Sequence, residues 1–148
     1  MEENNQKTIS KPIRFDGIGL HSGFNSSIRV LPSPKNSGIT FKRIDLKENN
    51  FIEANIKNVS SAKLCTTIKN DHGAKVSTIE HLLGAFYITG LDNALVEINN
   101  IEVPIMDGSS KDFVEEIEKV GLVKQEAKRK YLKILKDLKI KDDQKFLE

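Results

Sequence analysis

The sequence contains little cysteine, no long apolar run and no secretory signal. Its one cysteine, Cys65, cannot form an internal disulfide and cannot by itself supply a cysteine-type zinc site. No window approaches the roughly 18 consecutive apolar residues that a membrane-spanning helix requires. The first residues, MEENNQKTIS, are polar and acidic, without the basic end and apolar run of a signal peptide. These absences predict a cytoplasmic chain without a transmembrane segment.

Positive charge is also scarce outside the C-terminal end. Residues 124–148 carry nine Lys or Arg against five Asp or Glu, whereas residues 1–123 carry a net charge of −2 within the total of +2. Nucleic-acid binding needs a clustered positive surface, so we expect none for the main part of the chain. A hydrophobic content of 38% over 148 residues suits one compact domain and part of another.

The sequence does contain an alternating pattern, which is followed by a helical one. Before residue 75, short segments alternate apolar and polar residues between turn-forming residues, which predicts about five or six short strands. A helical period then begins, with Glu80 and His81 in its first turn and Gly90 as its expected stop. Its apolar positions are spaced i, i+3, i+4 and i+7, at Ile79, Leu82, Leu83 and Phe86.

A further strand and a second helix are expected after this segment. Residues 93–99 predict a strand, and Asn99-Asn100 predicts a hairpin turn after it. Residues 106–122 predict an amphipathic helix with serines at its start and Gly121 at its end. Strands followed by helices predict an α+β fold, a two-layer sandwich with a mostly antiparallel sheet and two helices on one face.

The composition changes near residue 125, where the chain becomes rich in lysine, and we predict a domain boundary there. Beyond it, leucines at helical spacing favour a helix. The pairs Leu132/Ile134 and Leu138/Ile140 alternate as in strands. The residue pattern leaves both structures open for this tail.

Glu80 and His81 stand side by side in the first turn of the predicted helix. Glu80 has an ordinary explanation, because Ser77 and Glu80 match a capping box, in which the acid binds the N–H of the cap residue. His81 lies about 200° around the helix from Ile79, so it should point away from the core. Because this helix is apolar on nearly all sides, we expect something outside the domain to cover His81.

The first turn of a helix also has suitable electrostatics for hydrolysis. The helix dipole favours an ionised Glu80 and a neutral His81, which are the forms a zinc hydrolase needs. One histidine is not a zinc site, however, and no HExxH motif is present. His21 lies on a glycine-rich turn, where it is either functional or merely solvated. The ordinary interpretation is a small core residue for Cys65 and a turn-former for Asp107.

Five short stretches occur in a distinctive order: GIGLHSG, KLCTT, STIEHLLGAF, LDNALVEINN and EVPIMDGSS. Together they closely resemble the N-terminal part of the UDP-3-O-acyl-N-acetylglucosamine deacetylases, the LpxC family of lipid A biosynthesis, from about Lys7 to Gly121. The resemblance implies two similar α+β domains packed face to face with zinc between them. Residues 1–125 would then be the first domain, and residues 126–148 would be the first strands of the second.

The resemblance also implies an enzyme that hydrolyses the N-acetyl group of UDP-3-O-acyl-N-acetylglucosamine with Zn²⁺ as cofactor. His81 matches the family's first zinc ligand, and Glu80 matches the acid that acts as general base. His21, Cys65 and Asp107 match residues near the substrate. The remaining zinc ligands of the family, a His and an Asp in an H-x-x-x-D arrangement, come from the second domain. The resemblance therefore implies that this chain alone is inactive.

The implied partners are the UDP-linked acylated glucosamine and the second domain of the same protein. Through the acylated substrate, peripheral contact with a membrane is also implied. An alternative is a non-catalytic α+β binding module of an RNA-associated type, which would use the basic tail at 124–148, because fold alone does not determine function.

Overall fold

The computed structural model describes residues 4–147 and contains a central five-stranded sheet. The strands lie in the order β2-β3-β9-β4-β5, and within this sheet only β4 and β9 run parallel. The predicted mostly antiparallel sheet is therefore confirmed. The bounds are β2 (Ile13–Ile18), β3 (Asn25–Pro32), β4 (Ile39–Arg43), β5 (Phe51–Glu53) and β9 (Ala94–Ile98).

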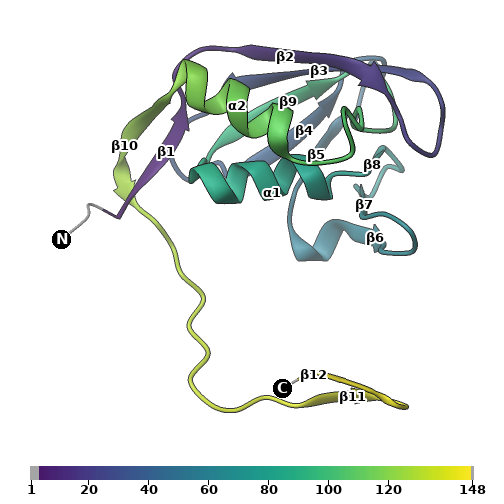
Figure 1. The fold of residues 1–148 in the computed structure, drawn as a ribbon, viewed down its shortest axis with the longest axis vertical. Coiled ribbons are helices and arrows are strands. Elements are labelled where there is room, and N and C mark those ends of the chain that lie inside the picture. Colours follow the sequence, from purple (N-terminus) through teal and green to yellow (C-terminus); the bar gives the residue numbers. More distant parts are fainter. Residues whose placement is uncertain (1–3, 148) are drawn as a thin grey trace.

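Alternation along these strands gives the sheet one apolar face. Phe15 and Phe41 are buried, whereas Arg14, the neighbour of Phe15 on the same strand, is exposed. Two helices, α1 (Glu80–Thr89) and α2 (Lys111–Val120), lie together on one side of the sheet (Figure 1). This arrangement is the α+β fold that the sequence predicts.

Phe113 of α2 connects the helix layer to the sheet. Its ring is fully buried and meets the ring of Phe15 edge-on, with centroids 4.8 Å apart and planes at 71°. Burying an aromatic side chain contributes about 1.5–3 kcal/mol, and an edge-to-face pair adds about 0.5–1.5 kcal/mol. The pair fixes α2 over β2, and with it the loop that precedes α2.

Both helices end where the sequence predicts, but α1 begins differently. Gly90, in the left-handed conformation with φ 78°, ends α1, and Gly121 ends α2. The predicted capping box is wrong, because Ser77 lies in a strand, β8 (Lys75–Ser77). Helix α1 begins at Glu80 without a side-chain cap, which leaves the Glu80 carboxylate available for another bond.

A small three-stranded sheet precedes α1. It consists of β6 (Val59–Ser61), β7 (Thr67–Lys69) and β8, in that order, and follows a 3₁₀ helix, η1 (Ile56–Asn58). Within the described part of the chain, seven strands begin before residue 75, slightly more than predicted. One reason is that the segment around Pro12 divides into β1 (Asn5–Ile9) and β2, since proline has no N–H for a ladder.

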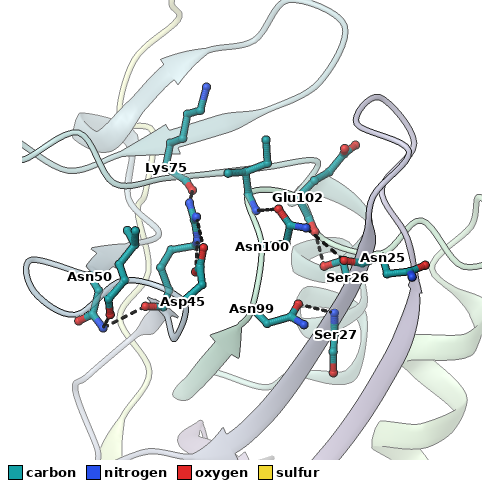
Figure 2. Close-up of polar contacts among 12 residues, drawn as sticks. Asn25, Ser26, Ser27, Asp45, Asn50, Lys75, Asn99, Asn100 and Glu102 are labelled. Atoms are coloured by element: carbon teal, nitrogen blue, oxygen red, sulfur yellow. Dashed lines mark hydrogen bonds and ion pairs between the residues drawn. The ribbon is translucent and has the colours of Figure 1, made fainter.

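The predicted hairpin turn at Asn99-Asn100 is wrong. After β9 the chain turns toward Ser77, with which Glu102 forms an isolated parallel bridge. The two asparagine side chains bind backbone N–H groups instead of leaving them to a hairpin: Asn99 Oδ1 accepts from Ser27 and Asn100 Oδ1 from the next residue, both at 2.8 Å (Figure 2). This turn carries residues 101–105 across the fold toward α1.

Strand β1 pairs with β10 (Leu122–Lys128), which crosses the boundary predicted near residue 125. Three amide side chains hold this pair against the rest of the fold. Asn93, which is 1% exposed, donates through Nδ2 to Gln6 Oε1 at 2.9 Å and to Gln125 Oε1 at 2.7 Å. Buried amides are costly unless they are paired, so this network fixes where β10 lies.

After β10 the chain leaves the main body (Figure 1). It forms a hairpin of β11 (Ile140–Asp142) and β12 (Lys145–Leu147), strands that pair with each other. Every described side chain from residue 130 to residue 147 is exposed. Across residues 4–147, no helix has the length and apolar character needed to cross a membrane.

Candidate active site at the start of helix α1

Glu80, the first residue of α1, lies against the loop that carries Cys65. Its Oε2 accepts a hydrogen bond from the Thr66 N–H at 3.1 Å. The Glu80 side chain is exposed and lies in the first turn of the helix. Cys65 is half-buried and lies outside the hydrophobic core, so the core interpretation of this cysteine is wrong. The structure therefore brings the Cys65 loop to the Glu80 carboxylate.

His81 lies outside the core, as the helical period predicts. It is half-buried, whereas Leu82 and Phe86 on the inner side of α1 are at most 2% exposed. Ile88, two turns further along the side of His81, is 69% exposed. The backbone carbonyl of His81 accepts a hydrogen bond from Ser110 Oγ at 2.8 Å. The loop before α2 thus reaches the first turn of α1.

Asp107 lies in that same loop and is exposed. Its Oδ1 accepts hydrogen bonds from the N–H and the hydroxyl of Ser109, both at 2.8 Å. The bond from the Ser109 backbone, followed by that from its side chain, lowers the pKa of Asp107. The turn-forming interpretation of Asp107 is confirmed, and the turn directs Ser110 toward His81.

Glu102 connects the His21 turn to the chain that enters α1, and the sequence analysis missed it. Its Oε1 accepts from the His21 N–H at 3.0 Å and from Thr78 Oγ1 at 2.7 Å. Its Oε2 accepts from the Ser22 N–H at 2.8 Å. The only available signal was a lone acid within the apolar run IEVPI, which predicts a buried polar partner without saying which.

Hydrogen bonding keeps the buried Glu102 carboxylate ionised. Burial, the largest single influence, raises its pKa, because desolvation disfavours the charged form. The bonds from the His21 backbone, the Ser22 and Thr78 side chains and the Ser22 backbone together outweigh burial and lower the pKa to about 2. Glu102 is therefore a fixed negative charge, 2% exposed, beneath the His21 turn.

Strained backbone positions flank the candidate residues. Three residues that are neither Gly, Asn nor Asp adopt positive φ within residues 4–147: Leu64 at 68°, Thr78 at 57° and Met106 at 55°. Leu64 precedes Cys65, Thr78 lies two residues before Glu80, and Met106 precedes Asp107. Such strain persists only where surrounding contacts enforce it, and it clusters at functional sites.

The described residues alone do not fit a zinc site. Among them, no three His, Cys, Asp or Glu side chains lie close enough together to hold a metal ion. His81 offers one imidazole of the kind that zinc binds, but a catalytic zinc normally takes three protein ligands. Any zinc held by His81 therefore needs further ligands from outside residues 4–147.

By its sequence relatives, this α+β chain falls in a class of proteins named for a deacetylase activity. A family model described as UDP-3-O-acyl N-acetylglycosamine deacetylase, LpxC, matches residues 6–148. The chain belongs to this family, and the resemblance noted from its motifs is confirmed.

Curated relatives support the same assignment. The chain is 41% identical over 143 residues to proteins named UDP-3-O-acyl-N-acetylglucosamine deacetylase from Shewanella frigidimarina, Shewanella denitrificans and Shewanella baltica. Each match covers 97% of this chain and 47% of the relative, so the chain spans about half the length of these proteins. None of these three is named as an RNA-binding protein, and the alternative hypothesis gains no support.

Proposed function

We propose that this chain is the N-terminal half of a zinc-dependent deacetylase that hydrolyses the N-acetyl group of UDP-3-O-acyl-N-acetylglucosamine in lipid A biosynthesis. The observation that carries the proposal is the pair at the start of α1: a carboxylate oriented by the Thr66 N–H and an imidazole outside the core. Family membership and the names of the relatives support the substrate. The proposal includes a cytoplasmic location and peripheral membrane contact through the acylated substrate.

In the proposed reaction, water attacks the acetyl carbonyl, and the C–N bond breaks to give acetate and a free amine on the sugar. Glu80 is the general base that takes the proton of the attacking water, and a proton is delivered to the nitrogen as the C–N bond breaks. His81 provides one ligand to zinc, which, when bound, supplies a Lewis acid to the site. His21, Cys65 and Asp107, on the three loops that approach α1, are the proposed substrate-binding residues.

The proposal places the missing ligands in a second domain. Residues 1–125 form the first domain, and residues 126–148 contribute the first strands of the next. Two observations support this division. The chain spans 47% of the length of its relatives, and the side chains of residues 130–147, which include the β11–β12 hairpin, are all exposed. The exposed side of α1 around His81 is the surface that the second domain would cover.

The test compares two proteins: the 148-residue chain and the chain extended through the coding region that follows residue 148. The 148-residue chain should show no deacetylation of UDP-3-O-acyl-N-acetylglucosamine and only weak zinc binding. The extension should contain a His and an Asp four residues apart and should restore both activity and one tightly bound zinc. Robust turnover by the 148-residue chain alone would refute the assignment of the missing ligands.

A further inference from the structure

Residues 101–105 lie between the two turns that border the candidate site, and backbone hydrogen bonds hold them there. Ser77 N–H donates to the Ile101 carbonyl at 2.8 Å, and Val103 N–H donates to the Ser77 carbonyl at 3.1 Å. On the other side, Ser26 Oγ donates to the Glu102 carbonyl at 2.5 Å (Figure 2). The backbone of Glu102 is therefore fixed independently of its side chain.

The Glu102 side chain then joins the two turns through one buried carboxylate. The His21 N–H and the Thr78 hydroxyl, 57 residues apart in the sequence, meet at the same oxygen, Oε1. Ser22 N–H binds the other oxygen, Oε2. Loss of the carboxylate would leave three buried or partly buried donors without this acceptor. A substitution that moves the backbone of one turn should therefore also change the conformation of the other turn.

Thr78 shows why this acceptor matters at the entrance to α1. A β-branched residue rarely adopts positive φ, yet Thr78 does so at 57° while 1% exposed. Its hydroxyl bond to Glu102 holds it in that conformation. The backbone direction set at Thr78 determines where Glu80 and His81 emerge two and three residues later.

We infer that Glu102 is a positioning residue, which holds the His21 turn and the first turn of α1 in one fixed relationship. This fixed geometry would present His21, Glu80 and His81 to one substrate, a consequence that rests on the proposed function. The coupling itself does not, because it is a property of hydrogen bonds within residues 19–81 and Glu102 and needs neither zinc nor substrate.

Each turn offers a substitution that disturbs the carboxylate from one side. A Cβ added at Gly19 would lie 2.3 Å from Ser22 Oγ and 2.5 Å from Glu102 Oε2, too close for the present arrangement of either side chain. Gly19→Ala should therefore displace the carboxylate from the His21 side. Thr78→Val removes the hydroxyl that binds Oε1, whereas Thr78→Ser keeps a hydroxyl and serves as its matched control.

The experiment records amide ¹H–¹⁵N spectra of the full 148-residue chain and these variants. G19A should shift the amide resonances of Glu80 and His81, and T78V should shift those of His21 and Ser22. T78S should leave the His21 and Ser22 resonances near their wild-type positions. In a Glu102→Ala background, which removes both acceptor oxygens, the response of Glu80 and His81 to G19A should be lost. Glu97→Gln, which removes a carboxylate from β9, should disturb neither turn.

The inference is overturned if G19A and T78V each shift only the resonances of their own turn, or if T78S acts like T78V. Should E102A fail to fold, the comparison of T78V with T78S still decides between the two results. Because these spectra need no catalysis, absence of coupling would refute the positioning role of Glu102 and leave the deacetylase proposal unaffected. Conversely, coupling in a full-length protein without deacetylase activity would refute only the proposed function.

Discussion

The backbone N–H of Thr66 donates to Oε2 of Glu80 at 3.1 Å. This bond gives the carboxylate a defined orientation before any substrate arrives, and orientation of a catalytic group is one source of rate enhancement. It also connects the loop that carries Cys65 to the first residue of α1.

Glu80→Ala should free the Thr66 amide. The bond is exposed and charge-assisted, so its loss should cost about 0.5–1.5 kcal/mol of local opening free energy. Hydrogen exchange at Thr66 should become about twofold to tenfold faster, because about 1.4 kcal/mol corresponds to a factor of ten. Glu80→Gln retains an acceptor and is the control, and equal exchange in both variants would contradict the assigned contact.

His81→Ala should abolish the weak zinc binding expected of this chain. Because His81 is half-buried and outside the core, the free energy of unfolding should change by less than about 1 kcal/mol. Zinc titration followed by calorimetry, together with urea unfolding, measures both effects. His72→Ala, an exposed histidine on the loop between β7 and β8, is the matched control. If H72A fails to bind zinc while H81A still binds it, the assignment of His81 as the zinc ligand is wrong.

Glu102 should make stability fall in acid. Its folded pKa is lowered from 4.5 to about 2, so its contribution is fully present above about pH 4.5 and is lost as the pH falls through the folded value. A shift of this size corresponds to about 3 kcal/mol. In urea unfolding, the stability deficit of Glu102→Gln relative to wild type should shrink steadily between pH 5 and about pH 2. A deficit that does not depend on pH would argue against an ionised Glu102.

Phe113→Ala should be strongly destabilising. The side chain is fully buried against Phe15, and truncation of a buried Phe costs about 3–5 kcal/mol. Chemical unfolding should therefore show a large loss of stability, with α2 released from the sheet. Val114→Ala, at a half-buried position on the same helix, should cost less. A similar cost for both would mean that Phe113 is not the anchor of α2.

Removal of the residues after Arg129 should leave the main body folded. The described tail side chains are all exposed, so the melting temperature should change little. Truncation after Gly121 is the contrasting variant, because it deletes β10 and with it Gln125, which binds Asn93. We expect that shorter chain to lose several kcal/mol, since it removes the pairing of β1 with β10 and one of the two acceptors of the buried Asn93 amide. Thermal unfolding followed by circular dichroism compares the two chains.

Sequence patterns predict the helices and their ends correctly where these depend on residues close together in the sequence. The period of Ile79, Leu82 and Phe86 located α1, and Gly90 located its end, because helix faces and left-handed stops depend on nearby residues. The same local logic produced the error at Ser77, where a matching motif was overridden by pairing with β7 in a small sheet. Asn99-Asn100 failed in a similar way, because its side chains bind backbone across the fold.

Sequence motifs indicate the candidate residues, and the structure places Glu80 and His81 in the first turn of α1, as the helical period predicts. Glu102 could not be found in this way. Its partners His21, Ser22 and Thr78 lie 81, 80 and 24 residues away in the sequence, and no periodicity links them. Only the folded chain shows that one acid serves both turns, because the contact depends on how three distant segments pack.

The pairing of β1 with β10 brings the two ends of the main body together, and the Arg129 N–H donates to the Asn4 carbonyl at 2.8 Å. A short peptide could therefore bridge these ends, and new termini could be opened at an exposed loop without breaking a sheet. Both ends of residues 4–129 lie at the β1–β10 edge. A protein fused to either end would therefore join this domain at the same place and could be exchanged without changing the fold of residues 4–129.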